Sequence, residues 1–256
     1  MKRFISKTTT YHYIKLVWRS LLFLAVLTLY IVNKVRDKQF DPLLENLSSN
    51  KYVMAIIIAI WAIFVIEILL RFFPSKIESM GCQKQFKRNY IPKEPAMTPN
   101  KQSGWRTFAV FAAWIALNAI FVTLYFTHVI DGGILIIISL FYSVCDMICI
   151  LFFCPFQTWF MKNRCCVSCR IYNWDFAMMF TPVAFIKNAF CISIFALAIL
   201  LLLEWEILYR KFPERFCRNT NEAISCANCT EKLCKHKRQL QSFIKKINIK
   251  EKHKNQ

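Results

Sequence analysis

Four cysteines surround one short stretch of the sequence, and their spacing suits thiol or metal chemistry. They are Cys154, Cys165, Cys166 and Cys169. Cys166 and Cys169 have the Cys-x2-Cys spacing of a redox dithiol, and the flanking arginines favour the thiolate that attacks a disulfide or binds a metal. Zinc is therefore a candidate for this loop, and the departure from ferredoxin spacing places an iron–sulfur cluster behind it. The competing interpretation is a structural site that ties the loop to the preceding helix.

A second cysteine group lies in the basic C-terminal tail. It comprises Cys217, Cys226, Cys229 and Cys234. Its Cys-x2-Cys pair is compatible with zinc ligation, whereas two disulfides are expected if the tail faces an oxidising compartment. In either case the group is expected to staple a segment that is too small to have its own hydrophobic core.

An acidic residue lies inside one of the apolar segments. Asp146 is surrounded in sequence by hydrophobic residues, and charged groups at membrane depth are costly and by default suggest function. Cys145 and Cys149 are four residues apart and therefore share a helix face beside this carboxylate. Asn118, in the preceding apolar segment, is a candidate hydrogen-bond partner. The pattern indicates a proton or cation relay, or alternatively an aspartate that is satisfied by packing within a helical bundle.

Helices must position these residues, and the hydrophobic pattern predicts five that approach the roughly 20 apolar residues needed to cross a bilayer. The expected spans are about 16–33, 52–70, 108–129, 133–154 and 183–203. Only a short link separates the third and fourth, which predicts an antiparallel helical hairpin. The expected fold is an all-α integral membrane protein with a Cys-rich interfacial loop. Residues 1–209 form its membrane domain, and residues 210–256 form a basic, Cys-rich tail.

Several charged residues near the ends of the spans are expected to anchor helices at the membrane surface. Lys15 and Arg19 can extend their charged groups to the lipid headgroups. Glu67 lies four residues before Arg71, which is a pairing distance on one helix. We interpret these residues as interfacial anchors and not as parts of a site.

The composition agrees with a membrane protein and excludes other classes. Of the 256 residues 56% are hydrophobic, yet the formal net charge is +19. A nucleic-acid-binding protein needs a soluble face for such charge, so no nucleic-acid partner is expected. The basic loops and tail are expected to contact the lipid bilayer and its anionic lipids. The four glycines leave little room for a Gly-rich nucleotide-binding loop.

The distribution of Lys and Arg around the spans predicts the topology. Five spans place the N-terminus inside and the C-terminus outside, in a multi-pass protein of the plasma membrane. A competing topology adds a sixth crossing at residues 171–186 and places both termini inside. The competing topology gathers most of the basic residues on one side, but its extra segment is short and contains Asp175 and Pro182.

Three functional interpretations follow. The leading one is thiol-redox or soft-metal handling at the membrane, with the loop from Cys154 to Cys169 as the site and with Asp146 and Cys149 lining an intramembrane path. The second is a non-catalytic membrane subunit or scaffold whose cysteines hold loops in place. The third is a small ion or solute transporter centred on Asp146.

Overall fold

The protein is helical throughout the part of the chain that the computed structural model describes. That part comprises residues 7–35, 51–74, 83–95, 97–100, 102–163 and 168–225. Within it, the β-type pairing consists of an isolated antiparallel bridge between Pro92 and Asn221. Five helices are long and apolar enough to cross a membrane. The prediction of an all-α, multi-pass membrane protein is therefore confirmed.

The five long helices each overlap one predicted span. Their bounds are α1 Lys7–Val35, α3 Lys51–Phe72, α5 Gly104–Phe126, α6 Gly132–Leu151 and α8 Ala189–Lys211. The first helix begins well before the predicted start, because its early turns carry a polar face that packs against α6. The last helix begins and ends later than predicted. Cys154, which was expected to end the fourth span, lies beyond α6.

Side-chain caps set the starts of α6 and α8. The Asp131 carboxylate accepts a hydrogen bond from the backbone N–H of Ile134 at 3.0 Å. The Asn188 side-chain oxygen accepts one from the N–H of Phe190 at 2.9 Å. Such caps satisfy backbone donors that a helix leaves unpaired in its first turn, and they favour starting the helix at the next residue.

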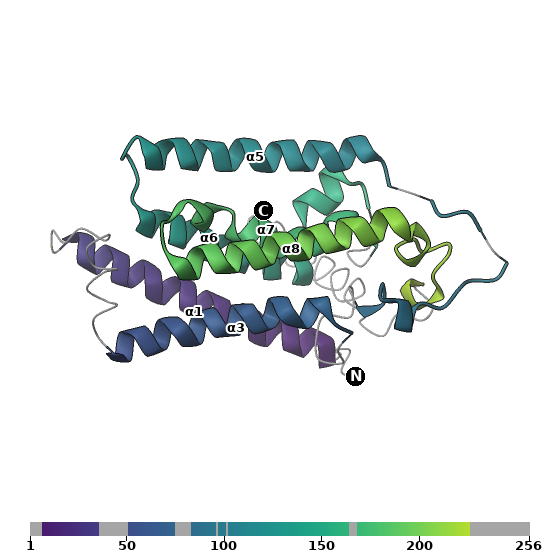
Figure 1. Ribbon diagram of the computed structural model, residues 1–256, viewed down its shortest axis with the longest axis horizontal. Helices are drawn as coiled ribbons and strands as arrows, with labels where there is room; N and C mark the ends of the chain where they lie inside the picture. The colour runs from purple at the N-terminus through teal and green to yellow at the C-terminus, as the bar shows by residue number, and fades with distance from the viewer. Residues whose placement is uncertain are drawn as a thin grey trace, which may run out of the picture.

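Short helical segments connect α6 to α8. They are η2 Phe156–Phe160, η3 Arg170–Trp174, α7 Asp175–Phe180 and η4 Pro182–Phe185. In Figure 1, α6 and α8 both run from left to right, so this connection must return along the length of the bundle. Arg170 pairs with Glu206 near the end of α8, whereas Phe185 packs against Phe126 at the end of α5. The connection therefore passes from one end of the bundle to the other.

The hydrophobic core surrounds this returning segment. Phe176 of α7 is 0% exposed, and Met179 is almost as deeply buried. The segment contacts α6 and α8, while η2 and η4 contact α5. The short link predicted between α5 and α6 is present, and these two helices run in opposite directions in Figure 1.

The loop before α5 packs against the beginning of the predicted tail. The backbone N–H of Lys93 donates to the Thr220 carbonyl at 3.1 Å, and that of Glu222 donates to the Ile91 carbonyl at 2.8 Å. Asn221 is fully buried between the two segments. The short helices here are η1 Lys87–Asn89, η5 Pro213–Arg215 and η6 Glu222–Ile224. Residues 213–225 thus pack against the loop before α5.

Candidate functional site

A buried ionic network joins three of the long helices. Arg19 of α1 is 1% exposed, and its guanidinium contacts the Glu67 carboxylate of α3 at 2.8 Å and the Asp146 carboxylate of α6 at 3.1 Å. It also donates to the Ser143 carbonyl at 3.1 Å. The Lys15 ammonium lies 3.4 Å from the second Glu67 oxygen. The expectation that Lys15 and Arg19 reach the headgroups is wrong, because both side chains turn into the bundle.

A second buried ion pair tethers α3 to the returning segment. The Arg71 guanidinium lies 2.6 Å from a carboxylate oxygen of Asp175, at the start of α7. The same guanidinium lies over the Phe176 ring, 4.6 Å from its centroid. Glu67 and Arg71 therefore bind partners on other elements, and the interpretation of both as interfacial anchors is wrong. Each charge has an opposite charge in contact, which membrane-embedded ionisable groups require.

The pairing of Asp146 differs from the one suggested by the sequence. Its carboxylate accepts a hydrogen bond from Arg19 of α1. The Asn118 side-chain amide instead donates to the Trp114 carbonyl of its own helix, at 3.0 Å. Asn118 is buried but is not among the residues that surround Asp146 in the cavity described next. The proposed hydrogen bond across the α5–α6 link is therefore not formed.

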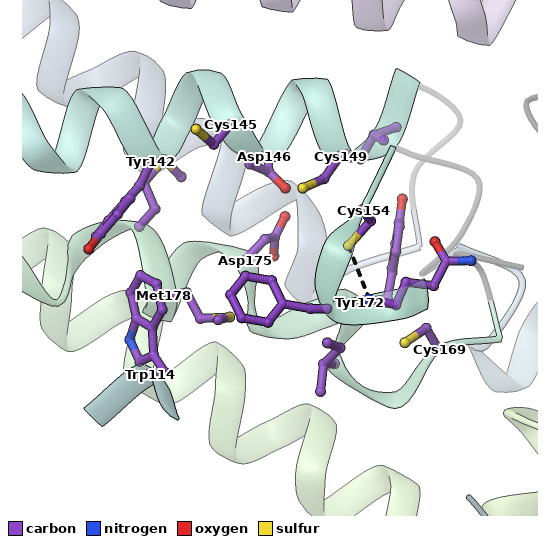
Figure 2. Close-up of a pocket in the computed structure, with 15 residues that line it drawn as sticks. Trp114, Tyr142, Cys145, Asp146, Cys149, Cys154, Cys169, Tyr172, Asp175 and Met178 are labelled. Atoms are coloured by element: carbon purple, nitrogen blue, oxygen red, sulfur yellow. Dashed lines mark hydrogen bonds between the residues drawn. The ribbon is translucent and has the colours of Figure 1, made fainter. Parts of the chain in front are cut away.

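A cavity of about 130 Å³ lies between α6, α7 and the segment that follows α6. Its lining includes the thiols of Cys145, Cys149, Cys154 and Cys169 and the carboxylates of Asp146 and Asp175. Figure 2 shows the two carboxylates pointing toward one another, with the Cys149 thiol beside Asp146. Most of the remaining lining is aromatic or aliphatic. The cavity thus brings together cysteines that the sequence analysis had assigned to two different groups.

Two of the cavity thiols are neighbours. The thiol of Cys149, in the last turn of α6, lies next to the thiol of Cys154, just beyond the helix. The Cys154 sulfur also accepts a hydrogen bond from the backbone N–H of Gln157 at 3.4 Å, which is the dashed line in Figure 2. The close pair is therefore Cys149 and Cys154. Sequence spacing had pointed to Cys166 and Cys169.

The described cysteines do not converge on a metal site. Among the residues whose positions are given, no group of three or more His, Cys, Asp or Glu side chains is arranged to hold a metal ion. Cys165 and Cys166 lie outside the described residues, so the four-cysteine loop site stays a prediction. The six described cysteines form no disulfide with one another. The candidate zinc and iron–sulfur centres gain no support from the described part of the chain.

The arginine beside Cys169 serves a structural contact. Arg170 binds the Glu206 carboxylate of α8 through two guanidinium nitrogens, and the Trp174 indole N–H donates to the same carboxylate at 2.9 Å. Burial lowers the pKa of the Arg170 guanidinium, but the hydrogen bond to Glu206 outweighs it and leaves the pKa above its ordinary value. Its charge is thus directed at Glu206, which fixes the thiol-bearing segment on α8.

The tail cysteines are only partly described. Cys217 is buried, and its thiol donates to the Asn100 carbonyl at 3.3 Å. This contact attaches the start of the tail to the loop before α5. Cys226, Cys229 and Cys234 lie outside the described residues. The choice between zinc and disulfides in the tail therefore remains a prediction.

Sequence reasoning missed Arg19, Glu67, Arg71 and Asp175 as partners of the candidate site. A usable signal was present, since each lies in or beside an apolar segment where a lone charge is costly. Their opposite signs could have suggested mutual pairing between the helices. Comparisons with protein-family models, curated proteins and solved structures give no match. What the molecule does must therefore be inferred from the cavity and the charges around it.

Proposed function

We propose that the protein is a membrane thiol–disulfide exchanger whose working pair is Cys149 and Cys154. The observation that carries this proposal is the cavity, which collects four thiols and holds those of Cys149 and Cys154 next to one another. Buried cysteines usually behave as small hydrophobic residues that pack among apolar side chains. Here two carboxylates share the cavity with the thiols. Two thiols within hydrogen-bonding reach need little movement to form a disulfide.

The exchange step requires a disulfide-bearing partner compound that reaches the end of α6. The Cys154 thiolate attacks one partner sulfur, the partner S–S bond breaks, and a mixed disulfide forms as the first partner thiolate leaves and takes up a proton. Cys149 then loses its proton and attacks the Cys154 sulfur, which releases the second partner thiolate. The partner disulfide is reduced to two thiols and the Cys149–Cys154 pair is oxidised, with two electrons transferred. The second partner thiolate takes up the proton that Cys149 loses, and the Asp146 carboxylate beside Cys149 in Figure 2 stays paired with Arg19.

This form of the hypothesis differs from the one based on sequence in its choice of thiols. The Cys166–Cys169 pair is retained as a relay that could pass electrons to the cavity, because Cys169 also lines it. Soft-metal handling is the less favoured form, since the described donors do not converge. The scaffold interpretation predicts that the cysteines of the folded protein do not undergo thiol–disulfide exchange.

Mapping the cysteine redox states tests the proposal. Membranes that contain the full chain are equilibrated in glutathione buffers, quenched by alkylation and analysed by peptide mass spectrometry. We expect a Cys149–Cys154 disulfide in oxidising buffers that disappears in reducing ones. In Cys149→Ser, Cys154 should instead accumulate as the mixed disulfide with glutathione.

Cys191→Ser provides the matched control, because Cys191 lies in α8, away from the cavity, and should leave the redox behaviour unchanged. If Cys149 and Cys154 remain alkylatable in every buffer, the exchanger is refuted and the scaffold is favoured. The rates at which glutathione attaches to Cys191 and to Cys154 are compared in the Cys149→Ser variant. Equal rates would indicate unselective reactivity and would also contradict the proposal.

The proposed topology is the six-crossing alternative, with α1 beginning and α8 ending on the same side of the membrane. The support is the return of the η3–α7–η4 segment along the bundle and the packing of residues 213–225 against the loop before α5. This topology also gathers most of the Lys and Arg residues on one side, which is then the inside. The plasma membrane is the proposed location. The test introduces single cysteines at Lys87, His128 and Arg215 and labels each with an impermeant reagent. The cysteines at Lys87 and His128 should react from opposite sides of the membrane, and those at Lys87 and Arg215 from the same side.

A second candidate function, a small-ion or solute transporter, is favoured by the broken helices beside Asp146 and Asp175. Discontinuous segments at membrane depth commonly form transport sites. The ion pairs of both carboxylates weaken this candidate, because a relay requires a carboxylate that exchanges partners. Loss of proton or cation flux in Asp146→Asn liposomes, with thiol exchange retained, would favour the transporter over the exchanger.

A further inference from the structure

A second cavity, of about 400 Å³, opens at the end of the bundle where α5 begins and α8 ends. Its polar lining comes from the loop before α5, the turn after η2 and the start of the tail. Three basic side chains line it: Arg106, Lys162 and Arg218. The described lining residues include no carboxylate. The described wall of the cavity is therefore basic.

Neutral hydrogen-bonding groups complete the wall. They are the side chains of Asn100, Gln102, Ser103, Asn163, Ser168 and Asn219. Three of these are held by bonds that keep the wall in place. Gln102 accepts from the Arg170 N–H at 3.0 Å, its amide donates to the Ser168 carbonyl, and Asn163 contacts the Ser168 hydroxyl. Hydroxyl and amide donors beside guanidinium groups are suited to an oxyanion.

The backbone at Lys162 has an unusual conformation. Its φ angle is 48°, in the left-handed region that non-glycine residues rarely adopt. It follows the π-helical segment η2, and the N–H groups of Met161 and Asn163 bond back to the Phe156 and Gln157 carbonyls. Such conformations concentrate at ligand-binding sites, because the surrounding structure must hold them. The turn directs the Lys162 residue to the cavity rim, where it lines the wall.

The cavity lies at the level expected for lipid headgroups. Trp105, at the first turn of α5, and Trp159, in η2, are both largely exposed on the protein surface. Exposed tryptophans at helix ends mark the membrane–water interface. A phosphate-bearing headgroup and a free phosphate ion can both reach this level.

We propose that this cavity is an anion site that binds a phosphate group, supplied either by an anionic phospholipid headgroup or by free phosphate. Arg106 and Arg218 provide forked guanidinium donors for the phosphate oxygens, and Lys162 provides a third positive charge. The site is separate from the thiol-lined cavity and does not depend on the exchange proposed above. It assigns a defined place for the anionic-lipid contact that the basic composition suggests.

The test uses the full-length protein in nanodiscs. One arm titrates inorganic phosphate into nanodiscs of neutral phosphatidylcholine and follows thermal unfolding. The other arm replaces part of the phosphatidylcholine with phosphatidylglycerol, and native mass spectrometry counts the lipids that remain bound. A rise in the unfolding temperature with added phosphate identifies the free ion as the ligand. Selective retention of phosphatidylglycerol identifies the lipid headgroup as the ligand.

Matched variants separate this site from general surface charge. The site variant carries Arg106→Gln, Lys162→Gln and Arg218→Gln, and we expect at least about tenfold weaker binding in the arm that responds. The control variant removes the same residue types at exposed positions outside the cavity: Lys87→Gln, Arg88→Gln and Arg210→Gln. Because Arg218 is partly buried, a double variant at the exposed Arg106 and Lys162 is measured as well.

The control should bind as the unmodified protein does. Equal loss of binding in the site and control variants would overturn the proposal in favour of diffuse electrostatic attraction. Absence of both a phosphate response and selective lipid retention would overturn it outright. Retained binding in a folded double variant would show that the two exposed basic residues do not form the site.

Discussion

Replacing Arg19 with methionine is expected to produce the largest loss of stability of any single change in the ionic network. The side chain is fully enclosed, and its guanidinium bridges Glu67 and Asp146 across three helices. Methionine retains much of the arginine stem and removes the charge. Glu67 keeps its contact with Lys15 at 3.4 Å, so Asp146 is the carboxylate that loses its ion-pair partner.

The expected cost follows from two estimates that agree. Removing one partner of a buried ion pair typically costs about 3–5 kcal/mol. The stranded carboxylate can instead take up a proton, and protonating a carboxylate of ordinary pKa, about 4, costs about 4 kcal/mol at pH 7. We therefore expect Arg19→Met to lower the free energy of unfolding by about 4 kcal/mol. The deficit should shrink as the pH falls, by up to about 1.4 kcal/mol per unit, because a proton then neutralises the carboxylate more easily.

The assay is reversible unfolding in mixed micelles, with the same pH series for each variant. Asp146→Asn combined with Arg19→Met removes both charges and should recover most of the loss. A cost below about 1 kcal/mol for Arg19→Met would place this pair in the range of exposed salt bridges and would refute the reasoning. A deficit that is constant with pH, or a double variant no more stable than Arg19→Met, would show that no stranded carboxylate is the cause.

Three further predictions concern the returning segment and its anchors. Asp175→Asn removes the carboxylate that Arg71 binds and should lower the free energy of unfolding by about 3 kcal/mol. We also expect faster proteolysis at α7. An unchanged free energy of unfolding would contradict this prediction. Arg170→Gln should lower the free energy of unfolding by the same amount at pH 6 and at pH 9. The raised pKa of Arg170 keeps its guanidinium charged over this range, so its bond to Glu206 is lost only far above pH 9. A cost that changes over this range in unfolding titrations would oppose that prediction. Asn188→Ala removes the α8 cap and should lower the free energy of unfolding by about 1 kcal/mol in the same assay. Asn188→Asp keeps a capping oxygen and should leave the free energy of unfolding close to that of the unmodified protein.

The helical membrane fold could be predicted because it depends on local composition. A run of about 20 apolar residues crosses a bilayer as a helix whatever surrounds it, since backbone groups must bond within the segment. The five long helices therefore match the five predicted spans. Their ends were less predictable, because they depend on caps such as Asn188 and on contacts made elsewhere.

The returning segment could not be recognised from hydrophobicity. Residues 171–186 are too short for a regular span, and they carry Asp175 and Pro182. Their burial is possible because Arg71, on a helix about one hundred residues earlier, neutralises Asp175. No local pattern contains that contact. The sixth crossing was accordingly an alternative in the sequence and became the favoured topology only with the packing in view.

The sequence by itself determined that the protein is helical, spans a membrane and carries chemically capable residues at Asp146 and in the cysteines around it. Only the tertiary structure decided which of these meet. It brings the thiols of Cys149 and Cys154 next to one another, pairs Asp146 with Arg19, and pairs Arg170 with Glu206. The physical reason is range: hydrophobicity acts along a segment of chain, whereas ion pairs and thiol contacts require side chains from separate helices to approach within a few ångströms.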